Sequence, residues 1–270
     1  MPELPEVETS VRALRPLLRG RMIVGIWNDW PRHIARLDLP EFAARLRGSR
    51  ITNLSRRGKY LVFHLDSPET LIIHLRMSGH LAVVAPDQPM HPHIHTVFHL
   101  DNGAELRFRD QRKFGQIYLT QNPRTVLGSL GPEPLEPAFT PEVLRERLQG
   151  RQRAIKPLLL DQSFIAGIGN IYADEALYAA RIDPRRSAAS LLEEEVMALY
   201  AGIRHVLQLG IDREGASIDL YVKPDGQKGD MQNAVQVFRR TGNPCNHCGQ
   251  PIERIVLGGR GTHYCPRCQQ

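Results

Sequence analysis

The chain has 270 residues, of which 41% are hydrophobic and 24% are charged, and its formal net charge is +6. This balance is typical of a globular protein with one or two domains, and it excludes a disordered chain, a collagen-like repeat and a disulfide-held miniprotein. No apolar run reaches the roughly 18 residues of a membrane span, and the acidic, Pro-rich residues 1–6 do not resemble a signal peptide. We therefore expect a cytoplasmic protein.

The first part of the chain predicts one helix followed by short strands. Apolar residues recur at helical spacing over residues 3–18, and Gly20 ends this predicted helix. A second, short helix is expected at residues 41–47. Segments rich in β-branched and aromatic residues predict strands at residues 22–27, 60–65, 70–75, 94–100 and 104–108. Asp101-Asn102-Gly103 predicts a hairpin turn, so we expect residues 1–122 to form a mostly antiparallel β-sandwich with flanking helices.

The composition changes after this region. Prolines and glycines interrupt residues 123–141, which we interpret as a linker. Beyond it, apolar residues follow helical spacing at 155–160, 171–180 and 191–209, which predicts a helical domain over residues 142–234. Gly167 and Gly169 predict a tight turn between two of these helices, whose amides could bind a phosphate, although a plain turn is the alternative.

The last module, residues 235–270, contains all the cysteines. They form two C-x2-C pairs separated by 16 residues: Cys245, Cys248, Cys265 and Cys268. This spacing places four thiolates around one Zn²⁺. The residues between the pairs predict a β-hairpin with Arg260 at the tip of its glycine-framed turn. Five arginines against one acid in residues 239–270 favour a polyanionic partner such as nucleic acid, the alternative being a solubilising surface.

The N-terminus combines a potential nucleophile with acids. Removal of Met1 would expose the secondary amine of Pro2, and an α-amino group with a pKa of about 7.7–8.0 is a usable nucleophile near neutral pH. Its attack on a sugar C1′ would give an iminium, and Glu3 or Glu6 could protonate a leaving group. The alternative is an ordinary helix start, because Pro and acids suit a first helical turn.

These N-terminal residues resemble the signature of the bacterial formamidopyrimidine-DNA glycosylase and endonuclease VIII family. The resemblance covers the whole chain through RGKYL, HLRMSG, DQRKFG, AIKP, GIGNIY and the zinc ribbon with Arg260. It implies an α+β multidomain protein: an N-terminal β-sandwich, a helix–two-turn–helix domain with a base-capping loop at about residues 215–231, and a zinc finger. It also implies a bifunctional DNA glycosylase and AP lyase of base excision repair.

The resemblance implies catalytic roles for matching positions. Pro2 would be the Schiff-base nucleophile, and Glu3 the acid that assists base loss and sugar-ring opening, with Glu6 in support. Lys59 would serve β-elimination and touch phosphate. Arg260 would hold the flanking phosphate and assist δ-elimination.

Other positions would handle the DNA. Met77, Arg112 and Phe114 match the residues that fill the void left by a flipped base, whereas without the family Met77 would be a core residue and Phe114 a strand residue. Lys156 matches a lesion-side lysine, with an ordinary helix lysine as the alternative. Phosphate contacts are implied for His93, Arg112, Arg151 and Asn170. His91, His93 and His95 alternate and would share a strand face, where a metal site is the alternative to DNA contact.

The sequence departs from the family pattern at several residues that bear on the choice of substrate. Arg76 stands where we expect Gly, Pro92 where Lys is usual, and Asp219 where a basic residue is common. An aromatic pair is replaced by Asp230-Met231. These departures concern the choice of lesion and not the reaction.

Three other functions compete with this interpretation. Leu4 and the void-filling residues favour oxidised purines over the oxidised pyrimidines of endonuclease VIII. A non-catalytic zinc-finger DNA-binding protein would be expected to have lost Pro2, Glu3 or Lys59. A zinc-ribbon RNA-binding protein leaves the N-terminal signature unexplained. We expect a nucleoid-associated monomer that binds damaged double-stranded DNA and carries one structural Zn²⁺.

Overall fold

The first helix follows from the spacing of its apolar residues. In the computed structural model, which describes residues 1–270, α1 (Leu4–Leu18) buries Leu4, Val7, Val11, Leu14 and Leu18 completely. Pro5 suits the first turn, because its missing N–H would have no partner there. The helix ends before Gly20, whose φ of +83° is a conformation that glycine adopts without strain. The predicted helix is therefore confirmed.

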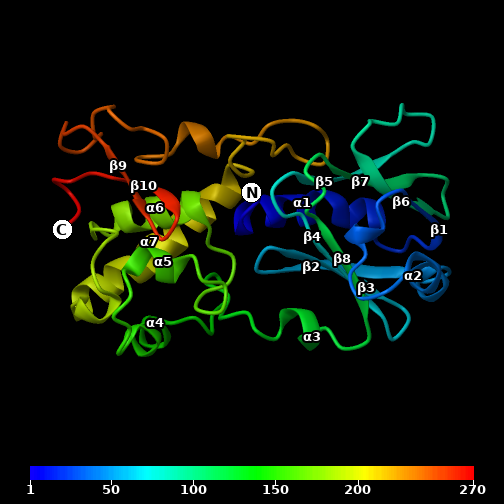
Figure 1. Ribbon diagram of the computed structural model, residues 1–270, viewed down its shortest axis with the longest axis horizontal. Helices are drawn as coiled ribbons and strands as arrows, with labels where there is room; N and C mark the ends of the chain where they lie inside the picture. Colours follow the sequence, from blue (N-terminus) through cyan, green and yellow to red (C-terminus); the bar gives the residue numbers. More distant parts are fainter. The chain divides into compact units, whose positions relative to one another are not determined.

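Two antiparallel four-stranded sheets follow, and they confirm the predicted sandwich (Figure 1). The first has the order β1 (Ile23–Asn28), β6 (Ile94–Leu100), β7 (Glu105–Asp110), β5 (Gly79–Val84). The second has the order β2 (Ile51–Arg57), β3 (Tyr60–Leu65), β4 (Thr70–His74), β8 (Gln116–Thr120). Phe63, Phe98 and Phe108 share one core with α1 and with Phe42 of α2 (Leu39–Leu46). Strands β2, β5 and β8 were not predicted.

Two connections between the sheets lie at one rim of the sandwich. The β4–β5 and β7–β8 loops both pass from one sheet to the other. His74 pairs with Gln116, and Gly79 pairs with Asp110, so both loops begin and end beside each other. This rim carries the residues Met77, Arg112 and Phe114.

Helices and a hairpin form the second part of the fold. Its elements are α4 (Pro141–Leu148), α5 (Ile155–Leu159), α6 (Asn170–Ala179), α7 (Glu193–Asp212), β9 (Glu253–Leu257) and β10 (Arg260–Tyr264). Helix α7 packs against α4 and α6, and α6 also packs against β10. Short helices complete the chain: η1 (Pro31–His33), α3 (Arg124–Leu127), η2 (Ala188–Ser190) and η3 (Met231–Asn233). No helix is both long and apolar enough to cross a membrane. Helix α4 was not predicted.

The chain divides into two units whose boundaries differ from the predicted domains. Unit 1 comprises Met1–Gly128 and Glu214–Asp230, and unit 2 comprises Ser129–Arg213 and Met231–Gln270. The predicted capping loop, residues 215–231, thus groups with the sandwich and not with the helices, and the zinc hairpin shares a unit with the helices. The predicted linker, 123–141, begins with α3, and the division falls after Gly128. Long-range hydrogen bonds, described below, explain why Glu214–Asp230 joins unit 1.

Candidate active site

The first residues of α1 are buried. Pro2 is buried behind an exposed Met1, and Glu3 and Glu6 are only 3% and 1% exposed. The Glu6 carboxylate accepts the backbone N–H of Glu3 at 2.8 Å, which is half of a capping box. Glu3 and Glu6 therefore begin the helix and also supply the carboxylates to which the resemblance assigns chemistry. The ordinary helix start and the catalytic role are compatible.

Glu6 also anchors the segment Glu214–Asp230 of unit 1. Its other carboxylate oxygen accepts the Ala216 N–H at 2.8 Å. Burial raises the pKa of Tyr221, and the negative charge of Glu6 raises it further, so the Tyr221 hydroxyl stays protonated and lies 3.4 Å from the Glu6 carbonyl oxygen. At the other end, His80 of β5 lies 3.0 Å from the Lys223 carbonyl oxygen. One carboxylate thus ties the N-terminal turn to this segment.

We expect Gly215→Ala to release this segment. Gly215 has a φ of +86°, and a Cβ there would lie 2.8 Å from the Tyr221 ring and 2.9 Å from Glu6 Cγ. Gly226 has a φ of +83° but nothing within 4 Å of the same position, so Gly226→Ala is a matched control. Both variants should lose about 1–2 kcal/mol of unfolding free energy to backbone strain. Gly215→Ala should lose about 1–3 kcal/mol more through the contacts.

Denaturant unfolding and hydrogen exchange of Glu214–Asp230 check this expectation. Equal losses in the two variants would show that Glu6 and Tyr221 do not hold the segment.

Lys59 occupies the two-residue turn between β2 and β3 and is 4% exposed. Helix α1 packs against both strands, so Lys59, Pro2 and Glu3 belong to the same unit. Burial, together with the charges of Arg76 and Lys59, lowers the pKa of the neighbouring His74 to about 3. His74 is therefore neutral, and its Nδ1 accepts the Arg76 N–H at 2.9 Å. Lys59 is thus a buried lysine close to a neutral histidine.

The rim loops expose the predicted void-filling residues. Met77 is 40% exposed and Phe114 is 51% exposed, so the alternative of a core methionine is wrong, and Phe114 lies in a loop and not in a strand. The Arg112 guanidinium lies 4.9 Å from the Phe114 ring centroid, a cation–π distance. The rim thus presents an apolar side chain, an aromatic ring and a positive charge on two adjacent loops.

The departure at Arg76 has a backbone consequence. Arg76 has a φ of +53°, in the region where glycine is free of strain and other residues are not. The turn therefore explains why glycine is expected at this position. Arg76 adopts the same turn and adds an exposed positive charge next to Met77.

The three alternating histidines lie side by side, as predicted, with ring centroids 5.3 Å apart for His91 and His93 and 6.5 Å apart for His93 and His95, but the prediction that all three lie in a strand is wrong. His91 and His93 lie in a turn closed by the Ile94 N–H and the His91 carbonyl oxygen, and only His95 is in β6. The turn forms because Pro92 follows His91 and cannot extend the β6 hydrogen-bond ladder. His95 pairs with Asp29 at 2.8 Å. His93 remains a candidate phosphate contact at the end of the strand.

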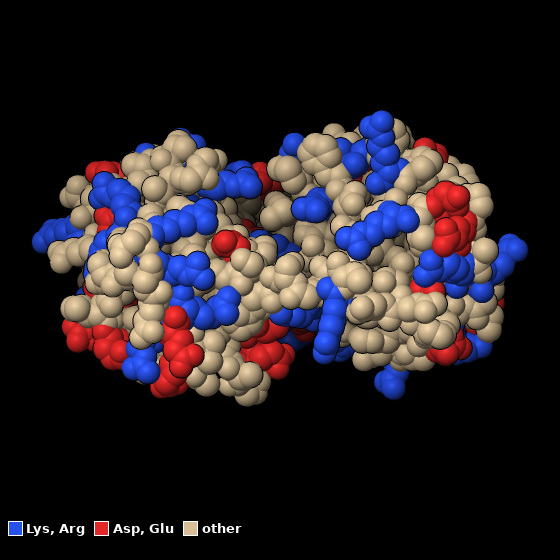
Figure 2. All heavy atoms as spheres, turned by 60° about the horizontal axis from the view of Figure 1, so that its bottom comes forward, with Lys and Arg blue, Asp and Glu red and all other residues tan.

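In unit 2, Arg260 is the exposed first residue of β10. The turn consists of Gly258 and Gly259, and Arg260 pairs with Leu257, so Arg260 follows the tip of the hairpin instead of forming it. Arg151 is also exposed, in the turn after α4. Exposed Lys and Arg side chains are numerous in Figure 2, with Asp and Glu side chains interspersed among them. Such surfaces suit a phosphate backbone.

A buried ion pair holds β10 against α6. The Lys156 ammonium lies 2.6 Å from the Asp174 carboxylate, and neither side chain is exposed. It also donates to the Gly261 carbonyl at 2.9 Å and to the Thr262 hydroxyl at 2.8 Å, which uses the three donors of an ammonium. Asn170 donates to the same Gly261 carbonyl at 3.0 Å. Lys156 and Asn170 thus support the residue next to Arg260, and direct lesion or phosphate contact by them remains a prediction.

The four cysteines form a structural zinc site. Zn–S bonds of about 2.3 Å in a tetrahedron require sulfurs about 3.8 Å apart. Cys245 and Cys268 are 3.9 Å apart at Sγ, Cys248 and Cys265 are 3.5 Å apart, and all four sulfurs lie within 4.8 Å of one another. Burial acts to raise the pKa of the Cys245 thiol, but hydrogen bonds from Tyr178 and backbone amides lower it to about 6. The residues present therefore fit Zn²⁺.

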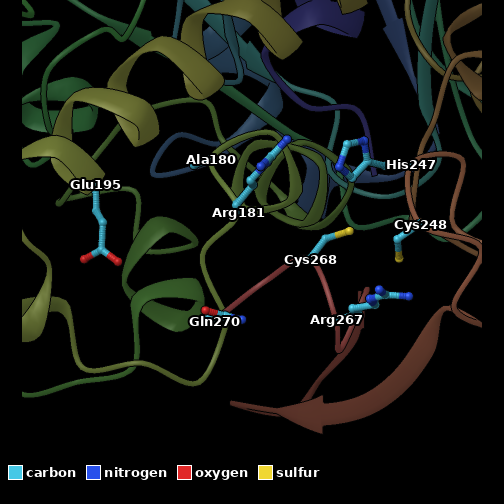
Figure 3. A pocket seen from close by; sticks show the side chains of 8 residues that line it. All are labelled: Ala180, Arg181, Glu195, His247, Cys248, Arg267, Cys268 and Gln270. Atoms are coloured by element: carbon cyan, nitrogen blue, oxygen red, sulfur yellow. The ribbon is translucent and has the colours of Figure 1, made fainter.

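An open pocket of about 630 Å³ lies beside this site (Figure 3). Arg181, His247 and Arg267 line it together with Cys248 and Cys268. Two of the four zinc ligands are therefore accessible from solvent, which matters for metal removal.

Family models match three stretches of the chain. The formamidopyrimidine-DNA glycosylase N-terminal domain matches residues 1–117, and the H2TH domain of the same enzyme matches residues 130–222. A zinc finger found in FPG and IleRS matches residues 242–270. The chain belongs to the formamidopyrimidine-DNA glycosylase family.

Relatives in this family are similar over all or most of their lengths. The formamidopyrimidine-DNA glycosylase of Symbiobacterium thermophilum is 51% identical over 100% of this chain and 89% of the relative, and that of Geobacillus kaustophilus is 47% identical over 100% of both. A Lactococcus lactis FPG variant, solved in complex with Fapy-dG-containing DNA, has a TM-score of 0.93 at 38% identity over 100% of both chains. The MutM (FPG) protein of Thermus thermophilus has a TM-score of 0.90 at 40% identity over 99% and 98% of the two chains. The predicted fold class is confirmed.

In this member of the formamidopyrimidine-DNA glycosylase family, sequence reasoning missed three buried acids. Asp110 contacts both rim loops, Asp174 pairs with Lys156, and Glu175 accepts three backbone N–H groups from residues 236–238 at 2.7–2.9 Å. Burial raises the pKa of Glu175. Asp174 and Glu175 in the middle of an apolar helix, and Asp110 at the end of an apolar strand, were the available signals, because buried acids need partners.

Proposed function

We propose that this family member is a bifunctional DNA glycosylase and AP lyase that excises oxidised purines, such as 8-oxoguanine and formamidopyrimidines. The observation that carries the proposal is the buried start of α1, where Pro2 and Glu3 lie side by side in the sequence at the N-cap. A secondary amine next to a carboxyl is the pair that imine chemistry at a sugar carbon requires.

The proposed reaction starts at the deoxyribose C1′ of a nucleotide that has been flipped out of the duplex. Once Met1 has been removed, the free secondary amine of Pro2 forms a bond to C1′ as the C1′–N bond to the damaged base breaks, and the base leaves with a proton. Glu3 protonates the sugar ring oxygen, which opens the ring and leaves an iminium between Pro2 and C1′. The iminium withdraws electrons and acidifies the C2′ protons.

Strand cleavage then follows by two eliminations. Loss of a C2′ proton expels the 3′ phosphate in the β-elimination, a step that we assign to Lys59. A second proton loss expels the 5′ phosphate in the δ-elimination, with Arg260 binding that phosphate. Water finally releases the sugar remnant from Pro2, and the product is a one-nucleotide gap.

Base removal requires that the void in the duplex be filled. We assign this to Met77, Arg112 and Phe114, whose exposure supports the role. We assign phosphate contacts to His93, Arg151 and Asn170. We further propose that the protein acts as a monomer on nucleoid DNA in the bacterial cytoplasm, with the zinc finger as a structural module.

The alternative substrate is an oxidised pyrimidine, as in endonuclease VIII. The side chain of Asp219 in the segment Glu214–Asp230 bears on this choice, because an acid there alters the charge offered to a flipped base. The void-filling residues favour the purine branch.

Borohydride trapping tests the proposal. The protein is incubated with duplexes that contain 8-oxoguanine opposite cytosine, an oxidised pyrimidine, or an abasic site, and the covalent product is digested with trypsin. Residues 1–12 contain no lysine, so a DNA adduct on this peptide can only be at the N-terminal amine. We expect the adduct there with the 8-oxoguanine duplex.

Other results would change the proposal in defined ways. An adduct only with the pyrimidine duplex would transfer the enzyme to the other branch. An adduct on the Lys59 peptide would replace Pro2 as the nucleophile. No adduct with any duplex would favour a non-catalytic DNA-binding protein.

A further inference from the structure

The two rim loops are joined by a buried serine and a buried aspartate that have no assigned role. We propose that Ser78 and Asp110 are positioning residues that lock the β4–β5 and β7–β8 loops into one rigid insertion device for DNA. This inference rests on the proposed function, because it concerns how Met77, Arg112 and Phe114 would enter the void beside a flipped base.

The β4–β5 loop is a tight turn. The Gly79 N–H donates to the Leu75 carbonyl oxygen at 2.9 Å, and the Arg76 N–H donates to His74 Nδ1. Met77 is therefore presented at the tip of a closed turn. Ser78 follows it and is 8% exposed, so its hydroxyl points away from solvent while its neighbour points into it.

The β7–β8 loop is built around the carboxylate of Asp110. The Lys113 N–H donates to the Asp110 carbonyl oxygen at 3.1 Å, and the Gly115 N–H donates to Asp110 Oδ2 at 2.6 Å. A Cβ on Gly115 would lie 2.4 Å from the Phe108 ring and 2.9 Å from that carboxylate. Only glycine fits at this position, so the chain approaches the carboxylate closely, with Phe114 directly before it.

Ser78 links the two loops. Its hydroxyl donates to Asp110 Oδ1 and accepts the Arg112 N–H at 2.9 Å. One hydroxyl therefore connects the residue after Met77 with the backbone of Arg112 and the carboxylate that holds Gly115. These contacts fix the tips of the loops relative to each other.

The aspartate is suited to this task because it remains an acceptor. Asp110 is fully buried, and its Oδ2 lies 3.4 Å from His33 Nε2, which is itself completely buried. Burial acts to raise the pKa of Asp110, but hydrogen bonds from His33, Ser78 and Gly115 lower it below its usual value. An ionised carboxylate can accept from all its donors, so the loops are held before DNA is bound.

Rigid loops of this kind would affect only reactions in duplex DNA, where a base must be flipped out of the stack. Side chains that are already arranged need no ordering when they enter the base stack, which lowers the cost of flipping. An abasic site in a single strand leaves no void to fill, so imine formation there does not depend on the loops. The ratio of base excision from a duplex to imine formation on a single strand therefore separates a positioning effect from general damage to the enzyme.

Ser78→Ala tests the proposal, with Ser67→Ala as the control, since Ser67 contacts only the Ser49 hydroxyl in the hydrogen bonds described. We expect Ser78→Ala to lower the single-turnover excision of 8-oxoguanine from a duplex by about tenfold to a hundredfold. Borohydride trapping on a single-stranded abasic oligonucleotide should stay within about twofold of the parent. A 2-aminopurine opposite the lesion should unstack more slowly.

Asp110→Asn provides a second variant that retains shape and removes charge. It should show the same split between duplex and single-strand reactions if it folds, as judged by its thermal unfolding. Equal excision by Ser78→Ala and Ser67→Ala would overturn the inference while the proposed function stands. An equal loss in both reactions would also overturn it, because the effect would be general. If the parent traps neither substrate, the proposed function fails, and the inference fails with it.

Discussion

Replacement of Glu3 by Gln is expected to lower the rate of 8-oxoguanine excision by about 10²–10⁴-fold, the usual contribution of a positioned general acid. Gln has the size of Glu and keeps a side-chain oxygen, so the start of α1 should remain folded. It cannot donate a carboxylic acid proton to the sugar ring oxygen or the leaving base. Single-turnover excision from an 8-oxoguanine duplex measures the loss.

Glu8→Gln is the matched control for this variant. Glu8 lies in the same helix, where it pairs with Arg12 at 2.8 Å and Arg56 at 3.2 Å. These ion pairs lower the pKa of Glu8 even though burial acts to raise it, so its loss should affect stability more than chemistry. We expect Glu8→Gln to excise at the parent rate. Similar rates for Glu3→Gln and Glu8→Gln would show that Glu3 is only a helix cap.

Removal of zinc should unfold the hairpin of unit 2 and abolish tight DNA binding. Apart from cysteines, the buried hydrophobic cluster around the metal site contains only Val237 and Ile252, which is too small to hold the cysteine loops without metal. Structural Zn²⁺ in small modules binds with about 10–16 kcal/mol, and much of this is folding free energy. A chelator can reach the metal because Cys248 and Cys268 line an open pocket. Arg260 would then lose its fixed position.

The composition of the chain allows each unit to be followed separately during this experiment. All four cysteines are zinc ligands, so thiol titration should rise from none to four as zinc is released. Both tryptophans, Trp27 and Trp30, belong to unit 1, so tryptophan fluorescence should stay constant. Affinity for an abasic duplex, measured at fixed salt, should fall together with the zinc content. Retained affinity after complete zinc loss would contradict a role for the hairpin in binding.

Local patterns predicted the elements with strong signals, and they failed where burial is set by partners distant in sequence. The apolar spacing of α1 and the β-branched and aromatic residues of β3 and β6 were sufficient for their prediction. Strand β2 is at the edge of its sheet and has the sequence ITNLSRR, in which only Ile51 and Leu54 are buried, so it lacks a strand pattern. Strand β5 begins with Gly79, which signals a turn when no neighbour is known.

The site residues also divide into those that local sequence patterns predict and those that depend on distant partners. The cysteine spacing alone indicated the zinc site, because all four ligands are close in sequence. The role of Glu6 at Ala216 and that of Asp110 at Ser78 depend on contacts between residues that are 210 and 32 positions apart in the chain. No local pattern contains that information. The N-terminal signature pointed to chemistry only through resemblance, since its acids also make an ordinary helix start.

The division of the chain has a consequence for its biosynthesis. The last piece of unit 1, Glu214–Asp230, leaves the ribosome after most of unit 2, because Ser129–Arg213 precedes it. The N-terminal sandwich therefore cannot bury Glu6 against Ala216 until the helices have already been synthesised, and unit 2 must wait for Met231–Gln270. Neither half can be completed independently as the chain emerges, so we expect both to mature late and nearly together, close to chain release.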